Sequence, residues 1–326
     1  MTLLDRHGRA PGVLRLSLTA RCNLACRYCC PDSHEPSGLL TDSQRLMLVR
    51  EAAALGWRQL RLTGGEPLLH GSLTALIARI RRQTCVAEVA LTSNGVLLTR
   101  SLAQALRQAG LDRLTLSLDG ADPAAVRRIG AGDSFPAVLR ALGHAREAGL
   151  PVKLNAVIAR HLNDNQVVPL AALARREGVE LRLIEYMDVG NRNGWQHQQV
   201  VTAAEMIRRI GQHWPLEPLG RPAAGTAQRW RYRDGGGLVA TVASISKPFC
   251  ADCNRLRITA DGVAYTCLFA AMGTPLRHLL EQTDSQPLRQ ALTDLWRQRQ
   301  DRYSEERGMD TAKTRQSHAE MAYLGG

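Results

Sequence analysis

Residues 13–29 read VLRLSLTARCNLACRYC, an apolar run typical of a β-strand that is followed by three cysteines. The spacing is Cys-x3-Cys-x2-Cys, from Cys22 through Cys26 to Cys29. Three thiolates in one loop can bind three irons of a four-iron cubane and leave the fourth iron open to a ligand. A zinc site that borrows a fourth ligand such as His34 is the alternative, since structural zinc usually takes four ligands.

Strand-like and helical patterns alternate after this first strand. Six apolar, β-rich runs are predicted as strands, namely Val13–Leu18, Arg58–Thr63, Val86–Thr92, Arg113–Leu118, Val152–Ile158 and Leu181–Tyr186. Helical spacing is found between them, over Asp42–Leu55, Leu73–Arg82, Ser101–Ala109, Phe135–Ala148 and Asn165–Glu177. Strict alternation predicts parallel strands with right-handed crossovers, and six units favour an α/β fold of the incomplete (β/α)6, TIM-like barrel type.

The chain of 326 residues is long enough for about two units at the usual ~150 residues per domain. We predict the barrel over residues 1–215 and a C-terminal region over residues 216–326. The Pro/Gly-rich stretch Pro215–Gly225 marks the boundary, after a helix near Ala203–Gln212. Beyond it we expect a hairpin formed by Gln228–Arg233 and Leu238–Ala243, and helical segments toward the end.

The composition is that of a folded globular protein. Hydrophobic residues make up 44% and charged residues 22%, which excludes a largely disordered or collagen-like chain. No apolar run reaches the ~18 residues of a membrane span, and Met1–Pro11 lacks the layout of a signal peptide, so we expect a cytoplasmic protein. The net charge of +12 suits nucleic acid or phosphorylated ligands equally, because the basic residues are spread without a long block.

A second group of cysteines lies near the C-terminal end. Thiols stay reduced in the cytoplasm, so clustered cysteines there indicate metal binding. Cys250, Cys253 and Cys267 have the spacing Cys-x2-Cys-x13-Cys. A zinc ribbon would need a second Cys-x2-Cys or two histidines, and neither follows. A second incompletely ligated iron–sulfur cluster is therefore favoured.

Polar residues stand at the carboxyl ends of the predicted strands, where barrel enzymes build their sites. The loop Thr63-Gly64-Gly65-Glu66-Pro67 follows the second strand. Its glycines permit close backbone approach to a ligand, and Glu66 can accept hydrogen bonds from an ammonium group. The same face should collect Thr92, Ser93, Asn94, Ser117, Asp119, Lys153, Asn155, Glu185 and Met187. Such a set predicts a ligand site, because inward barrel positions are normally apolar.

The first cysteine motif, with Tyr28 before its last cysteine and Gly-Gly-Glu-Pro after the next strand, resembles the radical S-adenosylmethionine (SAM) superfamily. The resemblance implies that Cys22, Cys26 and Cys29 bind a [4Fe-4S] cluster whose open iron is chelated by SAM. It also implies reductive cleavage of SAM to a 5′-deoxyadenosyl radical, a chemistry that the cofactor supplies.

The two cysteine groups together resemble the GTP 3′,8-cyclase (MoaA) family of molybdenum cofactor biosynthesis. The similar stretches run from Leu14 to the terminus, and include residues 61–67, 187–195 and 253–257 and the final Gly325-Gly326. The resemblance implies two [4Fe-4S] clusters and a C-terminal iron–sulfur region that covers the mouth of a radical SAM barrel.

The same resemblance assigns roles to single residues. It implies SAM contacts by Tyr28, Gly65, Glu66, Ser117 and Met187. It implies a second cluster on Cys250, Cys253 and Cys267, whose open iron meets the guanine of GTP. It implies GTP contacts by Arg15, Arg61, Thr92, Lys153, Arg255, Leu256 and Arg257, and guanidinium and ammonium groups do suit phosphate oxygens. Gly325 and Gly326 are implied to reach toward the active site.

The implied activity is that of a lyase. The adenosyl radical would abstract the 3′ hydrogen of GTP, and the C3′ radical would attack C8 to give (8S)-3′,8-cyclo-7,8-dihydroguanosine 5′-triphosphate. The implied partners are GTP, a reducing electron donor such as flavodoxin, and the next enzyme, cyclic pyranopterin monophosphate synthase. No nucleic acid or membrane partner is expected, and a homodimer is compatible with the resemblance.

Two other functions remain open from the residues alone. One is a radical SAM enzyme that modifies a peptide or another small molecule, and the other is a metal-binding nucleic-acid or regulatory protein. The chain also departs from the family at Ala20, where an aspartate is common, and at Cys30, where methionine is usual. Neither departure removes a thiol ligand.

Overall fold

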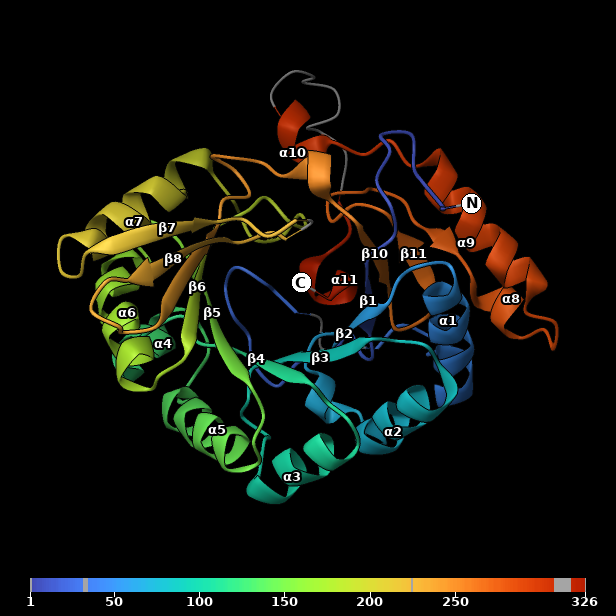
Figure 1. Cartoon of the computed structure of the whole chain (residues 1–326), viewed down its shortest axis with the longest axis horizontal. Helices are drawn as coiled ribbons and strands as arrows, with labels where there is room; N and C mark the ends of the chain where they lie inside the picture. The colour runs from blue at the N-terminus through green and yellow to red at the C-terminus, as the bar shows by residue number, and fades with distance from the viewer. Residues whose placement is uncertain (1, 32–34, 224, 308–317, 326) are drawn as a thin grey trace.

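The computed structural model describes residues 2–31, 35–223, 225–307 and 318–325. His34 and Gly326, which the sequence-based predictions name, lie outside these residues. The described strands form one twelve-stranded sheet in the order β12-β11-β10-β1-β2-β3-β4-β5-β6-β9-β8-β7. The sheet curves into an incomplete ring with helices around its outside (Figure 1).

The middle of the sheet is the predicted set of six parallel strands. They are β1 (Val13–Ser17), β2 (Gln59–Thr63), β3 (Glu88–Ser93), β4 (Arg113–Ser117), β5 (Val152–Ile158) and β6 (Glu180–Glu185). Each pairs with the next one along the chain, as βα units require. The prediction of an incomplete α/β barrel is confirmed.

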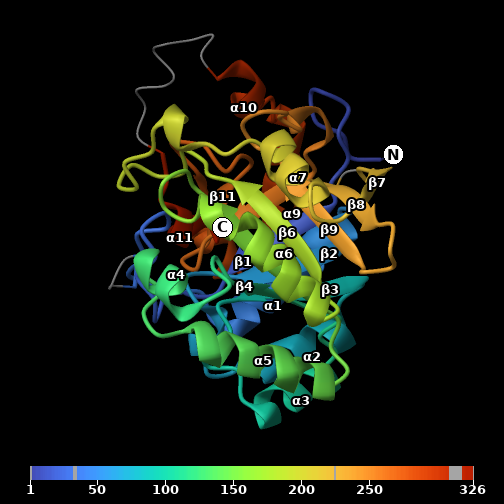
Figure 2. The same ribbon diagram turned by 90° about the vertical axis from the view of Figure 1, so that its left-hand side faces the viewer.

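The connecting helices cover the outer face of these strands, and Figure 2 shows α6 lying over β6. They are α1 (Asp42–Ala54), α2 (Leu73–Gln83), α3 (Arg100–Gln108), α5 (Phe135–Glu147) and α6 (Val167–Arg176). The short α4 (Pro123–Arg128), η1 (Pro67–Leu69) and η2 (Asp164–Gln166) were not predicted. Helix α4 begins where the Asp122 side chain accepts from the Ala125 N–H and proline occupies the first turn, a favoured start for a helix.

The C-terminal part extends this sheet at both edges. The predicted hairpin is formed by β8 (Gln228–Tyr232) and β9 (Leu238–Val242), and β9 pairs in parallel with β6. At the other edge β10 (Arg255–Ile258) pairs in parallel with β1. The sheet therefore runs across the boundary predicted at residue 215, and the division into two domains stays a prediction.

The remaining described elements all follow β6 in the chain. They are η3 (His197–Gln199), α7 (Ala203–Gly211), β7 (Leu216–Gly220), η4 (Cys250–Asp252), β11 (Val263–Tyr265), β12 (Thr274–Pro275), α8 (Arg277–Leu280), α9 (Gln286–Gln298), α10 (Tyr303–Glu306) and α11 (Met321–Leu324). Strand β7 lies in the stretch that was predicted as a boundary. Helix α11 lies near the middle of the ring (Figure 1). Among the described residues, no helix is long and apolar enough to cross a bilayer.

Alternation along the strands separates a hydrophobic layer from the barrel interior. Leu14 is in register with Leu60 on one side and with Leu256 on the other, and all three are buried in the core. Their neighbours along the strands have the opposite orientation, because successive side chains point to opposite faces. Polar residues on these strands can thus face the interior while the leucines pack the outer layer.

A pair of tryptophans joins α9 to the first βα unit. The Trp296 and Trp57 rings meet edge to face with centroids 5.1 Å apart, and both side chains are fully buried. The Trp296 indole N–H also donates to the carbonyl of Arg9 at 2.9 Å. Packing therefore ties α9 to the first βα unit, and one hydrogen bond ties it to the N-terminal segment.

We expect Trp296→Ala to lower the free energy of unfolding by about 3–5 kcal/mol, because it leaves a large cavity between α9 and α1. Urea denaturation followed by circular dichroism measures the change. Met272→Ala is the control, since Met272 is 88% exposed and such a surface change should stay within about 0.5 kcal/mol. A loss below about 1 kcal/mol in Trp296→Ala would show that this contact does not secure α9.

Candidate active site

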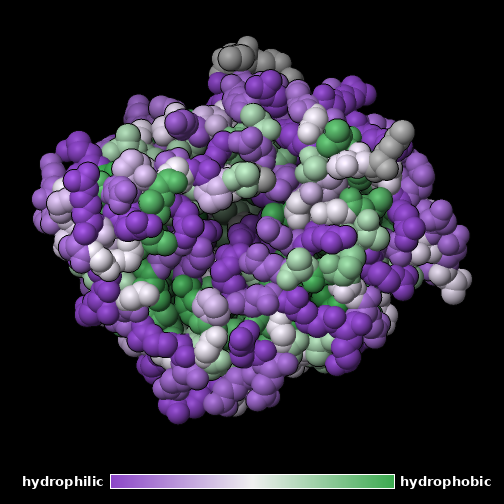
Figure 3. Space-filling view, in the orientation of Figure 1, coloured by the Kyte–Doolittle hydropathy of each residue, from purple (hydrophilic) through white to green (hydrophobic). Residues whose placement is uncertain are grey.

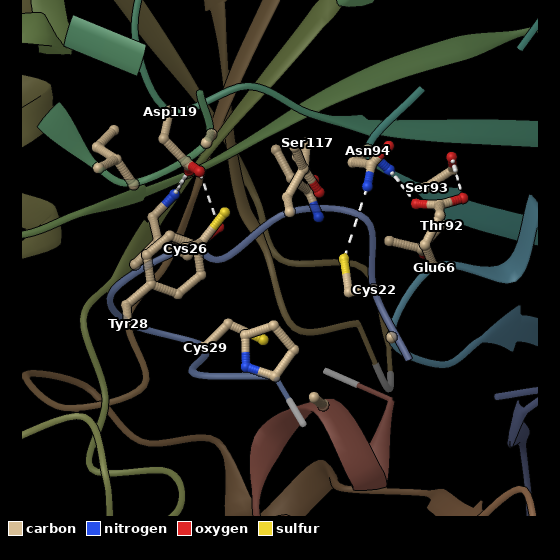
Figure 4. A pocket seen from close by; sticks show the side chains of 18 of the residues that line it. Cys22, Cys26, Tyr28, Cys29, Glu66, Thr92, Ser93, Asn94, Ser117 and Asp119 are labelled. Carbon is tan, nitrogen blue, oxygen red and sulfur yellow. Dashed lines mark hydrogen bonds between the residues drawn. The ribbon is translucent and has the colours of Figure 1, made fainter. Parts of the chain in front are cut away.

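One pocket brings the first three cysteines to the carboxyl ends of the strands (Figure 4). Its wall includes most of the residues predicted for this face, namely Cys22, Cys26, Tyr28, Cys29, Gly65, Glu66, Thr92, Ser93, Asn94, Ser117, Asp119 and Asn155, but not Lys153, Glu185 or Met187. The face of the molecule seen in Figure 1 is mostly hydrophilic and is hollowed near the centre of the ring (Figure 3). The pocket thus gathers side chains from the cysteine loop and from successive strand ends.

Two glycines let the loop after β2 pack against the backbone that precedes the cysteines. The Gly65 N–H donates to the carbonyl of Thr19 at 2.7 Å, and the Glu66 N–H donates to that of Arg21 at 2.8 Å. A Cβ atom at Gly65 would lie 2.1 Å from the Arg21 oxygen, and one at Gly64 would lie 2.5 Å from the Thr19 oxygen. The glycines are needed here for contact between two loops, not only for access to a ligand.

The Glu66 carboxylate fixes the next loop along the sheet. It accepts from Ser93 Oγ at 2.7 Å, from the Asn94 N–H at 2.7 Å and from the Leu68 N–H at 2.9 Å. The side chain is buried, and burial raises its pKa to about 6. Three donors already occupy this carboxylate, so its structural role is to align the loops after β2 and β3.

Tyr28 and Asp119 form a second link between the cysteine loop and the strands. The Tyr28 hydroxyl donates to Asp119 Oδ2 at 2.7 Å, and the Val157 N–H donates to Oδ1 at 2.7 Å. Burial raises the pKa of Asp119 to about 6, although these two hydrogen bonds oppose that rise. The loop carrying Cys26 and Cys29 is therefore attached to β4 and β5 through one carboxylate (Figure 4).

A carboxylate also supports the start of the cysteine loop, although Ala20 cannot supply one. Glu35 accepts from the Thr19 hydroxyl and, at 2.9 Å, from the Ala20 N–H. Glu35 thus provides acceptors next to the position where the family commonly has aspartate.

The chemistry of the three thiols fits an iron–sulfur cluster. All three are free cysteines facing one pocket. Burial and the nearby Cys22 raise the pKa of Cys29 to about 12, and burial with Asp119 raises that of Cys26 further. Three thiolates are unfavourable together here unless a cation neutralises them. Among the described residues, no three His, Cys, Asp or Glu side chains are placed to hold a single metal ion.

A second pocket holds the other cysteine group together with a set of arginines. It is lined by Cys250, Cys253 and Cys267, and by Arg15, Arg61, Arg182, Arg255, Arg257 and Arg299. Asp301 is a carboxylate in this lining and is paired with Arg299. The pocket is thus strongly basic, which suits a ligand with several negative charges.

Three of these arginines lie side by side on neighbouring strands. Arg15 on β1 is in register with Arg61 on β2 and with Arg257 on β10. Burial, followed by the repulsion of neighbouring arginines, lowers the pKa of Arg61 to about 9 and that of Arg257 to about 10. The buried Nε atoms of both lack a hydrogen-bond partner within the described ranges. An anion would relieve the repulsion and accept these hydrogen bonds.

The second thiol group differs from the first in its charge environment. Burial alone would raise the pKa of Cys253, but Arg255 and Arg299 lower it to about 6. Arg255 Nη2 donates to Cys253 Sγ at 3.1 Å. The pKa of Cys267 shifts in the opposite direction to that of Cys253, because burial and Asp301 raise it to about 12. The three thiols and nearby cations fit a cluster bound by thiolates, as in the first pocket.

The two pockets share one wall. Thr92, Asn155, Val157, Ile184 and Met321 line both of them. The buried Thr92 Oγ1 and Asn155 Oδ1 have no hydrogen-bond partner among the residues that the structure describes. A molecule held in the second pocket can therefore present atoms to the first.

Three residues predicted to contact SAM or GTP do not lie in the pocket that holds the other predicted contacts of the same ligand. Met187, predicted to contact SAM, lines the second pocket and not the first. Lys153, predicted to contact GTP, is paired with Glu180 at 2.9 Å and is in neither pocket lining. Leu256 is buried in the hydrophobic core beside Leu14.

Sequence reasoning missed several pocket residues. Arg182, Arg299, Asp301 and Met321 line the second pocket although none was singled out. Arg182 had a signal, because it alternates with the apolar Leu181 and Leu183 in a predicted strand. The other three are brought in by the packing of the C-terminal part and carry no local pattern.

Comparison with known proteins agrees with this arrangement. Residues 16–174 match the family model of the radical SAM superfamily, and residues 179–305 match that of Molybdenum Cofactor Synthesis C. The structure is similar to that of Streptococcus suis SuiB bound to S-adenosylmethionine, with a TM-score of 0.65 at 16% identity over 98% of this chain and 74% of that one. The fold and the cysteine loop are thus those of a radical SAM enzyme, a class that uses SAM and iron–sulfur chemistry.

Curated relatives narrow the class further. The chain is 55% identical over 339 residues to a GTP 3′,8-cyclase of Synechococcus sp. (strain CC9902), covering 99% of this chain and 98% of the relative. It is 46% identical to a GTP 3′,8-cyclase of Acidothermus cellulolyticus over 99% of this chain and 98% of that relative. The chain belongs to the GTP 3′,8-cyclase family.

The C-terminal tail contributes to the lining of both pockets. Arg15 Nε and Nη2 donate to the Gly325 carbonyl at 3.0 and 2.7 Å. Met321 and Ala322 line the first pocket. Gly325 has a φ of +68°, and a Cβ atom there would lie 2.3 Å from Thr63 Cγ2. The tail can therefore dock in this position only with glycine at residue 325.

We expect Gly325→Ala to lower GTP cyclisation about tenfold or more, because about 1–2 kcal/mol of left-handed backbone strain adds to the clash with Thr63. Product formation by mass spectrometry and iron content measure the effect, and iron should be unchanged. Gly143→Ala is the matched control, since a Cβ atom there meets nothing within 4 Å. Unaltered turnover in Gly325→Ala would contradict a role for the docked tail. The deletion of Gly325 and Gly326 should act in the same direction.

Proposed function

We propose that this chain converts GTP to (8S)-3′,8-cyclo-7,8-dihydroguanosine 5′-triphosphate in molybdenum cofactor biosynthesis. One observation carries the proposal: two thiol-lined pockets share a wall, and only the second of them is lined by a row of arginines. SAM held at the first thiol group supplies a 5′-deoxyadenosyl radical when it is reduced. The second pocket holds the molecule from which the hydrogen is taken.

The arginines on β10, β1 and β2 bind the triphosphate. Arg257, Arg15 and Arg61 carry planar guanidinium groups that line one pocket, and their mutual repulsion falls when an anion binds. Arg182 belongs to the same set, because it lines the pocket while Glu180 holds its Nε at 2.7 Å. Met187 also lines this pocket, so we assign it to the substrate and not to SAM.

The cysteines hold two clusters with separate tasks. Cys22, Cys26 and Cys29 hold the [4Fe-4S] cluster that binds SAM, with Tyr28, Gly65 and Ser117 around it. Cys250, Cys253 and Cys267 hold a second [4Fe-4S] cluster that binds the guanine. Thr92 and Asn155 on the shared wall meet the ribose, whose hydroxyls can donate to their unpaired oxygens.

The wider setting follows from this reaction. A reducing electron donor such as flavodoxin supplies the electron, and cyclic pyranopterin monophosphate synthase takes the product. We propose that the protein is located in the cytoplasm. A homodimer is one assembly that is compatible with this function.

Anaerobic incubation of reconstituted protein with SAM, dithionite and GTP tests the proposal. We expect the cyclised nucleotide by mass spectrometry, together with 5′-deoxyadenosine, and about eight irons per chain. Stoichiometric zinc in protein isolated without air, or SAM cleavage without any product from GTP, would overturn it.

The two clusters should be separable by single cysteine changes. We expect Cys26→Ser to abolish both SAM cleavage and product, because it removes a thiolate from the cluster that chelates SAM. Cys267→Ser should still cleave SAM but form no cyclised product and bind GTP more weakly. The measurements are 5′-deoxyadenosine release and product formation on the same samples. Full cyclisation by Cys267→Ser, or loss of SAM cleavage with its first cluster intact, would contradict this division of tasks.

A further inference from the structure

The N-terminal segment forms a buried ionic network with the end of α9. The two lie side by side, and the chain begins next to α9 (Figure 1). Asp5, Arg9 and Arg299 are exposed by only 6%, 6% and 4%. The Asp5 carboxylate accepts from Arg9 Nε at 2.6 Å and from Arg299 Nη1 at 3.3 Å. It also accepts from the N–H groups of His7 and Arg9, both at 2.9 Å. One carboxylate thus orients two guanidinium groups that are far apart in the sequence.

Both guanidinium groups also bind the backbone of the second cysteine group. Arg9 Nη1 donates to the Cys250 carbonyl at 2.7 Å, and Arg299 Nη1 donates to the Cys253 carbonyl at 2.6 Å. These are the first two thiols of the second pocket, and a single turn of 3-10 helix, η4, connects them. The carbonyl of each cysteine of this turn is therefore held by one arginine.

Stability alone does not account for this arrangement. Replacing a buried ionic group by well-packed hydrophobic residues is often neutral or stabilising, because desolvation offsets the attraction between the charges. What the network adds is geometry, since a guanidinium carries five donors in a rigid fork and can bind a carboxylate and a carbonyl at once. Arg299 is held further by the Trp296 ring, 4.6 Å from its central carbon.

We propose that Asp5, Arg9 and Arg299 are positioning residues that hold Cys250 and Cys253 ready to receive the second iron–sulfur cluster. This inference rests on the proposed function for the existence of that cluster. The network contains no thiol, and its hydrogen bonds to Cys250 and Cys253 go to their carbonyls, so these bonds fix the shape of the turn. Its loss should reduce cluster binding at the second site and leave the first site unaffected.

A nearby ion pair provides a matched control. Glu51 on α1 is buried and binds Arg289 on α9, with Nη2 and Oε2 2.7 Å apart. This pair joins the same helix to the barrel, but none of the hydrogen bonds that it makes within the described part of the chain reaches the cysteine turn. Glu51→Gln therefore reports the general cost of weakening the attachment of α9.

The test uses the full chain with Cys22, Cys26 and Cys29 changed to serine, so that only the second site can bind iron. After anaerobic reconstitution we expect about four irons per chain, and less than half of that in Arg299→Gln and in Arg9→Gln. Glu51→Gln should keep the iron of its parent. A second measurement follows the alkylation of the iron-free chains by iodoacetamide, with the exposed Cys85 as internal reference.

We expect Cys250 to be alkylated about tenfold faster relative to Cys85 in Arg9→Gln, because the charged hydrogen bond to its carbonyl, worth ~1.5 kcal/mol or more, is lost. If the parent binds no iron, the proposed second cluster is wrong and this inference falls with it. If the parent binds iron, both arginine variants match it in iron, and Arg9→Gln matches it in alkylation, only the inference is overturned. Equal loss of iron in Glu51→Gln would also overturn it, because the effect would then be general stability.

Discussion

The parallel pairing of β1 with β10 is the contact on which the site depends. It places Val13 beside Arg255 and Arg15 beside Arg257, and so joins the start of the chain to the second cysteine group. The pairing forms backbone hydrogen bonds and packs Leu256 against the leucine layer. The same register turns the arginines on either side of Leu256 toward the interior, because side chains alternate along a strand. One strand thus contributes to the core and to the basic pocket.

The arginines in the barrel interior repel one another, and a bound anion can offset this unfavourable energy. Arg15 and Arg257 are buried beside the half-buried Arg61, and desolvation with mutual repulsion lowers the pKa of all three. Apolar residues usually fill such positions. A row of positive charges in their place destabilises the fold when no anion is bound. It indicates that arginine stands at these positions for its affinity for an anion and not for stability.

Both ends of the chain are used to close the site. The N-terminal segment reaches the cysteine turn through Arg9, and the C-terminal tail reaches Arg15 through the Gly325 carbonyl. Side chains hold the tail as well, since Tyr323 donates to Asp261 at 2.5 Å and Glu320 accepts from the Asn191 N–H at 3.0 Å. Termini are often frayed, but here hydrogen bonds to distant elements fix the described parts of both.

The sequence by itself determined the six βα units, the hairpin, and the grouping of the first three cysteines with Glu66 and the strand ends. These features depend on local periodicity and on loops that follow strands, so neighbours in the chain are neighbours in space. Only the tertiary structure decided that β10 and β9 extend the barrel, that Lys153 pairs with Glu180, and that Arg299 joins the second pocket. Those contacts join residues far apart in the sequence, and their register is fixed by side-chain packing that no local pattern encodes.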